Sequence, residues 1–198
     1  RGVSLLSIIS KCYTSILNSR LYKWLEENNM ISESQAGFRK GYSAVDQIFN
    51  LYAIVQKCMQ KKGRKLYVAF VDFRKAFDSV HHDKLLECLK NQGVKGKFIA
   101  SLKSMYCSLL SCVRANYEFT DFFECPVGVR QGCVLSPTLF SVFINQLANH
   151  MNANGKHGIQ ILPGIMELFI LLFADDVALL STTACGLQNQ LNVLHRCC

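Results

Sequence analysis

Two adjacent carboxylates, Asp175 and Asp176, stand between apolar stretches near the end of the 198-residue sequence. Residues 168–174 and 177–181 predict two strands, with the two aspartates as the two-residue turn between them. Like charges held this close repel each other, and a divalent cation relieves the repulsion. An ordinary polar hairpin tip is the alternative, because Asp is common in turns.

A third acid, Asp72, ends the apolar stretch 66–73, which predicts a central strand buried on both faces. Acids at strand ends lie where ligands bind in α/β sheets, although many only cap the next turn. Together with the aspartate doublet, Asp72 would form a three-carboxylate cluster of hard oxygen ligands suited to Mg²⁺ or Mn²⁺. Two such ions about 3.5–4 Å apart stabilise the attacking and leaving oxygens in phosphoryl transfer.

The elements that position these acids follow from periodicity and capping. Apolar spacing predicts helices, and Val, Phe, Tyr and Thr predict a hairpin over residues 111–129. Ser43 caps one helix, His81 and His82 start another, and Ser136-Pro137 starts a third. The predicted helices cover residues 5–28, 43–60, 82–91 and 97–107, a segment from 136, and a last segment from about Gly186. Trp24 of the first helix is predicted to lie in the core. Residues 61–65 predict a basic turn, whose cations either follow a nucleic-acid backbone or are only solvated.

Composition bounds the class of protein. With 50% apolar and 18% charged residues, the chain can bury one sizeable core, in at most two small domains, and is not disordered. A net charge of +8 suits a polyanionic partner, or marks a merely basic protein. The ten cysteines lack zinc spacing and predict free thiols in an intracellular compartment. The most apolar run, 165–180, is too short and too charged to span a bilayer, and we expect a fragment of a longer protein.

Four ordered segments resemble one family. F-A-D-D at 173–176 resembles the catalytic hairpin of reverse transcriptases, and A-F-V-D-F-R-K-A-F-D at 69–78 resembles their first metal-binding strand. V-R-Q-G-C-V-L-S-P at 129–137 resembles the loop and helix that line the nucleotide site, and Q-A-G-F-R-K-G at 35–41 is similar to a fingers motif. The set resembles the reverse transcriptase of a non-LTR (LINE-type, jockey-like) retrotransposon.

This resemblance implies an α+β right-hand polymerase core, with an antiparallel palm sheet packed on helices and the thumb missing. Residues 1–65 would be mostly fingers, and 66–198 mostly palm with interleaved fingers segments. The activity implied is RNA-directed DNA synthesis, in which a primer 3′-hydroxyl attacks the α-phosphate of a dNTP. The implied partners are an RNA template, a DNA primer, dNTPs and other domains of the same polyprotein, with no membrane, in the nucleus or a cytoplasmic ribonucleoprotein.

The resemblance also implies roles for single residues. Asp72 and Asp175 would bridge two Mg²⁺ ions, for which Mn²⁺ can substitute, with Asp176 assisting and the Phe73 carbonyl holding the nucleotide-side ion. Phe77 would exclude a ribose 2′-hydroxyl, although a ring here also suits simple core packing. Gln131 and Gly132 would lie beneath the nascent base pair, or would form only a turn. Arg1, Lys11 and Arg39 would contact the triphosphate, and the candidates for nucleic-acid contact are Lys40, Ser136 and Pro137. The cations also suit a solvated surface.

Three other functions compete with this hypothesis. An RNA-synthesising polymerase of the same architecture typically carries a second Asp where Phe77 stands, so this residue favours DNA synthesis. A degenerate or truncated element copy would bind nucleic acid without polymerase activity. Tyr42, where family members often carry a basic residue, weakens template or phosphate contact but leaves the metal ligands intact. A structural α/β domain with chance motifs would need four ordered coincidences.

Overall fold

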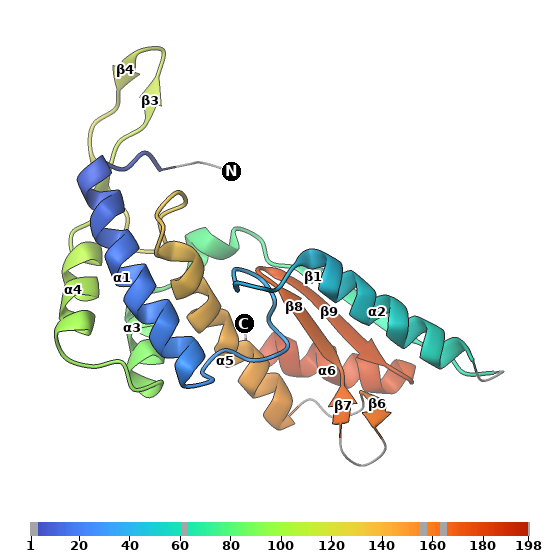
Figure 1. Ribbon diagram of the computed structural model, residues 1–198. Coiled ribbons are helices and arrows are strands. Elements are labelled where there is room, and N and C mark those ends of the chain that lie inside the picture. The colour runs from blue at the N-terminus through green and yellow to red at the C-terminus, as the bar shows by residue number, and fades with distance from the viewer. Residues whose placement is uncertain (1–3, 61–62, 155–157, 163–165, 198) are drawn as a thin grey trace. The chain divides into compact units, whose positions relative to one another are not determined.

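The computed structural model describes residues 4–60, 63–154, 158–162 and 166–197. Arg1, Lys61, Lys62 and Cys198 lie outside the described residues. The chain has a mixed α+β fold with small antiparallel sheets, as predicted (Figure 1). It divides into two compact units, the first formed by residues 1–30 and 75–143 and the second by residues 31–74 and 144–198. The predicted division into fingers and palm stays a prediction.

The first unit opens with α1 (Ile8–Glu27), which starts three residues later than predicted because Ser7 caps it. The Ser7 hydroxyl accepts the N–H of Ser10 at 3.2 Å, and Asn28 closes the helix as expected. The apolar side chains around its start are exposed, so the first turn contributes nothing to the core. The buried face of α1 consists of Thr14, Leu17, Leu21 and Leu25, and Trp24 is half-buried beside it.

The rest of the first unit follows the prediction. The 3-10 helix η1 (Ala76–Ser79) precedes α3 (His82–Asn91), which begins after His81, and α4 (Lys97–Tyr106) packs against α3. The predicted hairpin is built from two short ladders, β2 (Leu110–Ser111) with β5 (Phe123–Glu124) and β3 (Arg114–Ala115) with β4 (Glu118–Phe119). Helix α5 (Ser136–Asn154) begins at the predicted Ser-Pro pair, and its first half belongs to this unit.

The second unit is organised around one antiparallel sheet. Its strands are β1 (Tyr67–Asp72), β9 (Asp176–Ser181) and β8 (Ile170–Phe173), in the order β1-β9-β8. The prediction that residues 66–73 form a central strand is therefore wrong. Among the described residues β9 is central and β1 pairs only with β9, which leaves Phe70 74% exposed and Asp72 exposed.

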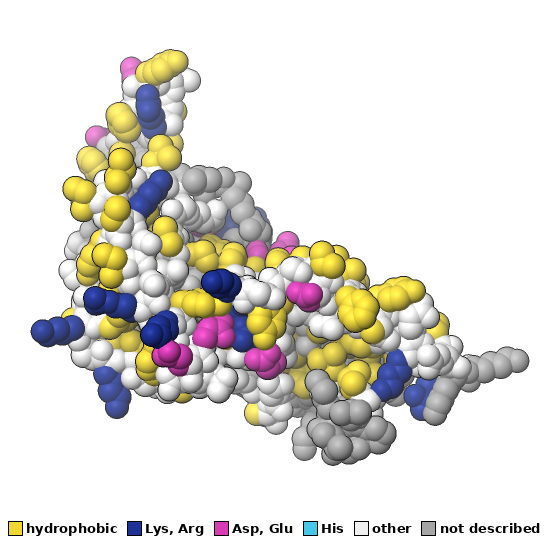
Figure 2. Space-filling view, viewed as in Figure 1, with side chains coloured by type: hydrophobic (Ala, Val, Ile, Leu, Met, Phe, Trp, Pro, Cys, Tyr) yellow, Lys and Arg dark blue, Asp and Glu magenta, His cyan; other side chains and the backbone are white. Residues whose placement is uncertain are grey.

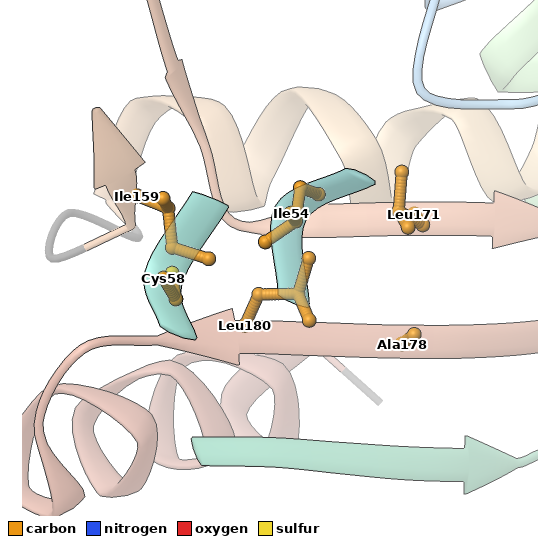
Figure 3. Packing of buried hydrophobic residues seen from close by; sticks show 6 residues of the cluster. All are labelled: Ile54, Cys58, Ile159, Leu171, Ala178 and Leu180. Atoms are coloured by element: carbon orange, nitrogen blue, oxygen red, sulfur yellow. The ribbon is translucent and has the colours of Figure 1, made fainter. Parts of the chain in front are cut away.

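Helices cover this sheet unevenly. From α2 (Ala44–Met59), Ile54 and Cys58 pack on Leu171, Ala178 and Leu180 of the sheet (Figure 3). The α6 helix (Ala184–Cys197) contacts β1 and β9, and Gln190 from it donates to the Leu180 carbonyl at 3.0 Å. A ladder of β6 (Ile159–Leu162) with β7 (Met166–Leu168), absent from the sequence prediction, adds Ile159 to the α2 cluster.

Helix α2 begins where the sequence predicts it, because Ser43 caps it. Ser43 and Asp46 form a reciprocal capping box, in which the Ser43 N–H donates to the Asp46 carboxylate at 2.7 Å. Apolar side chains nevertheless remain exposed along α2 and gather in one area over it (Figure 2), among them Val45, Ile48 and Phe49. The N-terminal half of α2 therefore leaves part of the sheet face beside it uncovered.

Candidate active site

Two of the three predicted metal ligands meet directly in the sheet. Asp72 is the last residue of β1, Asp176 is the first residue of β9, and the two stand opposite each other in the antiparallel register. Residues paired in this way point to the same face, with Cβ atoms about 4.5–5.5 Å apart. Both side chains are exposed. Sequence positions separated by about a hundred residues are thus brought together as a carboxylate pair at one end of the sheet.

The turn of the hairpin differs from the prediction by one residue. Phe173 pairs with Asp176, so the turn residues are Ala174 and Asp175, and the predicted Asp175-Asp176 turn is wrong. Ala174 takes the left-handed conformation with φ of 57°, which closes the hairpin one residue early. Asp176 consequently lies in the strand, where its orientation is fixed by the ladder, and the half-buried Asp175 lies in the turn.

This arrangement fits a divalent cation by its donor set. Across the described residues there is no group of three or more His, Cys, Asp or Glu side chains at metal-holding range, so the predicted three-carboxylate cluster is not assembled. The paired Asp72 and Asp176 offer hard oxygen donors at one point. Mg²⁺ is commonly held by one or two carboxylates together with substrate phosphates rather than by a closed protein cage. Two paired acids with a third in the adjoining turn match that requirement.

The ends of these strands border a groove. A cavity of about 350 Å³ runs between α2 and the sheet, lined mainly by apolar side chains such as Ile48, Leu51 and Phe70, with Asp72 and Asp176 at its margin. The two carboxylates are exposed at the margin of this largely apolar groove.

A buried glutamine that the sequence interpretation did not single out contacts the β8–β9 hairpin. Gln35 is 0% exposed, its Oε1 accepts the N–H of Ala174 at 3.0 Å, and its Nε2 donates to the Ala174 carbonyl at 3.2 Å. The sequence showed Gln35 and Gly37 only as members of a fingers-like motif, because Ala174, which both contact, lies 139 residues after Gln35.

The cation predicted from the same motif is engaged within its own loop. Arg39 is 8% exposed and pairs with Glu33 at 3.4 Å, and its guanidinium carbon lies 4.2 Å from the centre of the Tyr42 ring. The Tyr42 hydroxyl in turn donates to Glu33 at 2.8 Å. Tyr42, which departs from the family pattern, thus braces Arg39, and the phosphate contact predicted for Arg39 stays a prediction. Lys40 is exposed beside it.

The predicted nucleotide-site residues of the first unit cluster among themselves. Phe77 stacks on Phe140 with ring centroids 4.5 Å apart, and the Gln131 amide donates to Asp78 at 3.0 Å. The Val129 N–H donates to the Phe77 carbonyl at 2.8 Å, and Gly132 has a φ of 103°. The stack supplies the core packing considered for Phe77, and the Gln-Gly pair does form a turn. Their nucleotide roles stay predictions.

Other candidates in this unit have structural surroundings. Ser136 is 1% exposed and Pro137 half-buried in the first turn of α5, and their nucleic-acid contact stays a prediction. Lys11 is exposed on α1. Burial raises the pKa of the Tyr106 hydroxyl to about 12 and that of the Cys88 thiol to about 11. The nine described cysteines are free thiols.

Basic side chains border a second cavity in the second unit. Lys57, Arg64 and Lys65 line a space of about 580 Å³ together with Thr182 and Thr183. A polyanion would find a complementary surface there, and a solvated turn is the alternative. Among the residues that the structure describes, none of the helices combines the length and the apolar character of a bilayer span.

Comparison with known proteins identifies the family of this chain. All of residues 1–198 match the family model described as reverse transcriptase (RNA-dependent DNA polymerase). The chain is 31% identical over 204 residues to the probable RNA-directed DNA polymerase from transposon BS of Drosophila melanogaster, covering 100% of this chain and 22% of that protein. It is 28% identical over 187 residues to the RNA-directed DNA polymerase from mobile element jockey of Drosophila funebris, covering 93% of this chain and 19% of that protein.

Solved structures share the fold. The apo telomerase of Candida tropicalis truncated from its C-terminal domain superposes with a TM-score of 0.63 at 13% identity, over 93% of this chain and 36% of that chain. The telomerase of Candida albicans in complex with a fragment of telomeric RNA gives 0.62 at 12% identity, over 92% and 32%. The chain therefore spans about a third of these structures and about a fifth of the two curated relatives.

Proposed function

Because this chain belongs to the reverse transcriptase family and is related to the enzymes of non-LTR retrotransposons, we propose that it is the fingers-and-palm core of an RNA-directed DNA polymerase acting in retrotransposon replication. The observation that carries the proposal is the pairing of Asp72 with Asp176 at one end of the sheet, next to the Asp175 turn. A register that places two acids opposite each other at an exposed edge costs stability through repulsion unless they serve a cation.

The carboxylates would hold Mg²⁺, or Mn²⁺ in its place. Asp72 and Asp175 would be the main ligands, Asp176 would assist, and the carbonyl of Phe73, the residue after β1, would help to hold the ion on the nucleotide side. When bound, such ions supply charge neutralisation for the triphosphate and for the primer 3′-oxygen. The chain's own contribution is to fix the orientation of the acids through the β1–β9 ladder.

The proposal assigns further roles from the resemblance to the family. Phe77 is the proposed gate against ribonucleotides, and Gln131 with Gly132 would contact the nascent base pair. Lys11 and Arg39, with Arg1 outside the described residues, would meet the triphosphate. The candidates for template or primer contact are Lys40, Ser136 and Pro137. The RNA template, DNA primer and dNTPs are the proposed partners, and further domains of a polyprotein would complete the enzyme.

Primer extension tests this function. A protein that carries this chain together with a downstream thumb segment should extend a DNA primer on an RNA template with dNTPs and Mg²⁺. Asp175→Asn should abolish extension while the urea unfolding curve stays close to that of the parent. Asp121→Asn, which removes an exposed acid far along the chain from the doublet, is the matched control and should extend normally.

The outcomes separate the alternatives. Equal extension by the parent and by Asp175→Asn would show that the metal assignment is wrong. A parent protein that binds primer–template but adds no nucleotide would favour the degenerate copy, and one that adds NTPs as readily as dNTPs would favour RNA synthesis.

A further inference from the structure

The first turn residue of the catalytic hairpin is held by a side chain from a distant loop. Gln35 is fully buried, and its Oε1 accepts two backbone N–H groups, from Ala174 at 3.0 Å and from Gly37 at 2.7 Å. Its Nε2 donates to the Ala174 carbonyl at 3.2 Å. One amide therefore satisfies both the donor and the acceptor of Ala174, the residue that immediately precedes Asp175.

The loop backbone supports this contact. Residues 34–36 run alongside β8 as a short parallel bridge, in which the Ala36 N–H donates to the Leu172 carbonyl at 3.0 Å and the Leu172 N–H donates to the Ser34 carbonyl at 2.9 Å. A Cβ atom on Gly37 would lie 2.0 Å from the Ala174 nitrogen. The loop therefore presses on the turn so closely that only glycine fits.

Ala174 needs such support. Its φ of 57° lies in the left-handed region, which non-glycine residues occupy at an energetic cost and keep only when the surroundings determine the backbone. With no support, the hairpin would relax toward other turn conformations, and the direction of the Asp175 side chain would change with it. The register of Asp176 with Phe173 depends on the same turn.

We propose that Gln35 is a positioning residue for the polymerase centre: through Ala174 it fixes the turn that carries Asp175 and starts β9 at Asp176. The proposal rests on the proposed function, because it concerns the geometry of the same carboxylates. Gln35 itself touches neither metal nor nucleotide in this scheme. It acts as partners outside the ligand shell do, whose loss typically lowers metal affinity or activity by about 10–100-fold.

The test compares two buried glutamines. Gln35→Met keeps the length and shape of the side chain and removes its three hydrogen bonds. Gln190→Met is the matched control, because Gln190 is also 0% exposed and its amide donates to the Leu180 carbonyl of β9, well along that strand from Asp176. Both variants lose a buried amide, and both should lower the urea midpoint of the full chain.

Only Gln35→Met should change the site. We expect Mn²⁺ affinity of the full chain, measured by electron paramagnetic resonance without substrate, to fall about tenfold or more. In the thumb-extended protein, kcat should fall by about 10–100-fold while KM for dNTP stays within about twofold, because orientation rather than nucleotide contact is lost. Gln190→Met should leave Mn²⁺ affinity and kcat within about twofold of the parent. Gln35→Glu keeps the acceptor for both N–H groups but loses the donor to the Ala174 carbonyl, so it should also lower Mn²⁺ affinity, and it carries the test if Gln35→Met fails to fold.

Asp72→Asn distinguishes the two levels of the hypothesis. If Asp72→Asn loses Mn²⁺ binding while Gln35→Met and Gln35→Glu both bind like the parent, the positioning role of Gln35 is refuted and the metal site stands. If Asp72→Asn binds Mn²⁺ like the parent, the proposed site itself fails. An equal loss of Mn²⁺ affinity in Gln35→Met and Gln190→Met would show a general effect of stability and would also refute the positioning role.

Discussion

Gly37→Ala is the sharpest single perturbation of the β8–β9 hairpin that carries the proposed metal ligands. The new Cβ would meet the backbone nitrogen of Ala174 at 2.0 Å and its Cα at 2.7 Å. Neither neighbour is the end of a flexible side chain, so the loop and the turn must separate. Reaching an ordinary contact of 3.4 Å requires a shift of about 1.4 Å, which is enough to break the 3.0 and 3.2 Å bonds that join the Gln35 amide of the loop to Ala174 of the turn.

The expected cost follows from those broken contacts. Overpacking of a buried site costs about 1–3 kcal/mol, and each buried N–H left unsatisfied adds about 1–3 kcal/mol. The reduced freedom of the unfolded chain returns about 0.4–1 kcal/mol. We therefore expect the free energy of unfolding to fall by about 3 kcal/mol. A displacement of this size next to Asp175 should lower primer extension by about 100-fold.

Gly41→Ala is the control within the same loop. Gly41 has a φ of +87°, and no atom lies within 4 Å of the position that a Cβ would take there. Ala at this position therefore costs backbone strain of about 1 kcal/mol and displaces no neighbour. Urea titration, Mn²⁺ titration and primer extension should be run on both variants. The reasoning is refuted if Gly37→Ala keeps the Mn²⁺ affinity and extension rate of the parent, or if Gly41→Ala loses them equally.

Three further predictions concern the rest of the chain. Phe77→Val should lower the preference for dNTP over NTP by about tenfold or more, whereas Phe140→Leu, which loosens the same ring stack, should lower stability only; equal preferences in parent and Phe77→Val would refute the gate. Arg64→Gln and Lys65→Gln should each reduce the slope of log affinity for nucleic acid against log salt by about 0.9, and an unchanged slope would leave a solvated turn. The pKa of Tyr106 is about 12 in the folded protein against 10.0 in the unfolded chain, so its contribution to the free energy of unfolding is complete below pH 10. That contribution should fall by about 2–3 kcal/mol as pH rises to 12, and Tyr106→Phe should flatten this pH dependence in urea titrations.

Local chemistry made much of the fold predictable. Ser43 caps α2 through a reciprocal box with Asp46, because a hydroxyl cap acts on the nearest backbone groups, and α5 begins at the Ser136-Pro137 pair, where proline suits the first turn. The apolar positions of α5 from Leu139 to Met151 are buried as their spacing indicates, except that Phe143 is half-buried. Elements whose ends depend on neighbours a few residues away were therefore placed to within a few residues.

The position of a strand within its sheet is not local information. An apolar run such as residues 66–73 suits a strand covered on both faces, but Phe70 is exposed because β1 lies at the edge and α2 covers only part of the face. The prediction of the turn residues was wrong for a related reason. Residue type favours Asp in turns over Ala. The left-handed Ala174 is stabilised by Gln35, 139 residues earlier in the chain, and no nearby residue signals that contact.

The register of β1 with β9 explains why Asp72 and Asp176 lie opposite each other on an otherwise apolar sheet. On the face covered by α2, successive pairs across β1 and β9 are Val68 with Leu180, Phe70 with Ala178, and Asp72 with Asp176. Packing on α2 fades along this series, from Leu180 buried against Cys58 to an exposed Asp72. A slip of one residue would turn Asp72 to the opposite face, where Val177 and Leu179 are buried, and a carboxylate without a partner is costly there. Burial of the apolar end thus fixes the register, and the register in turn brings the two carboxylates together at the open end.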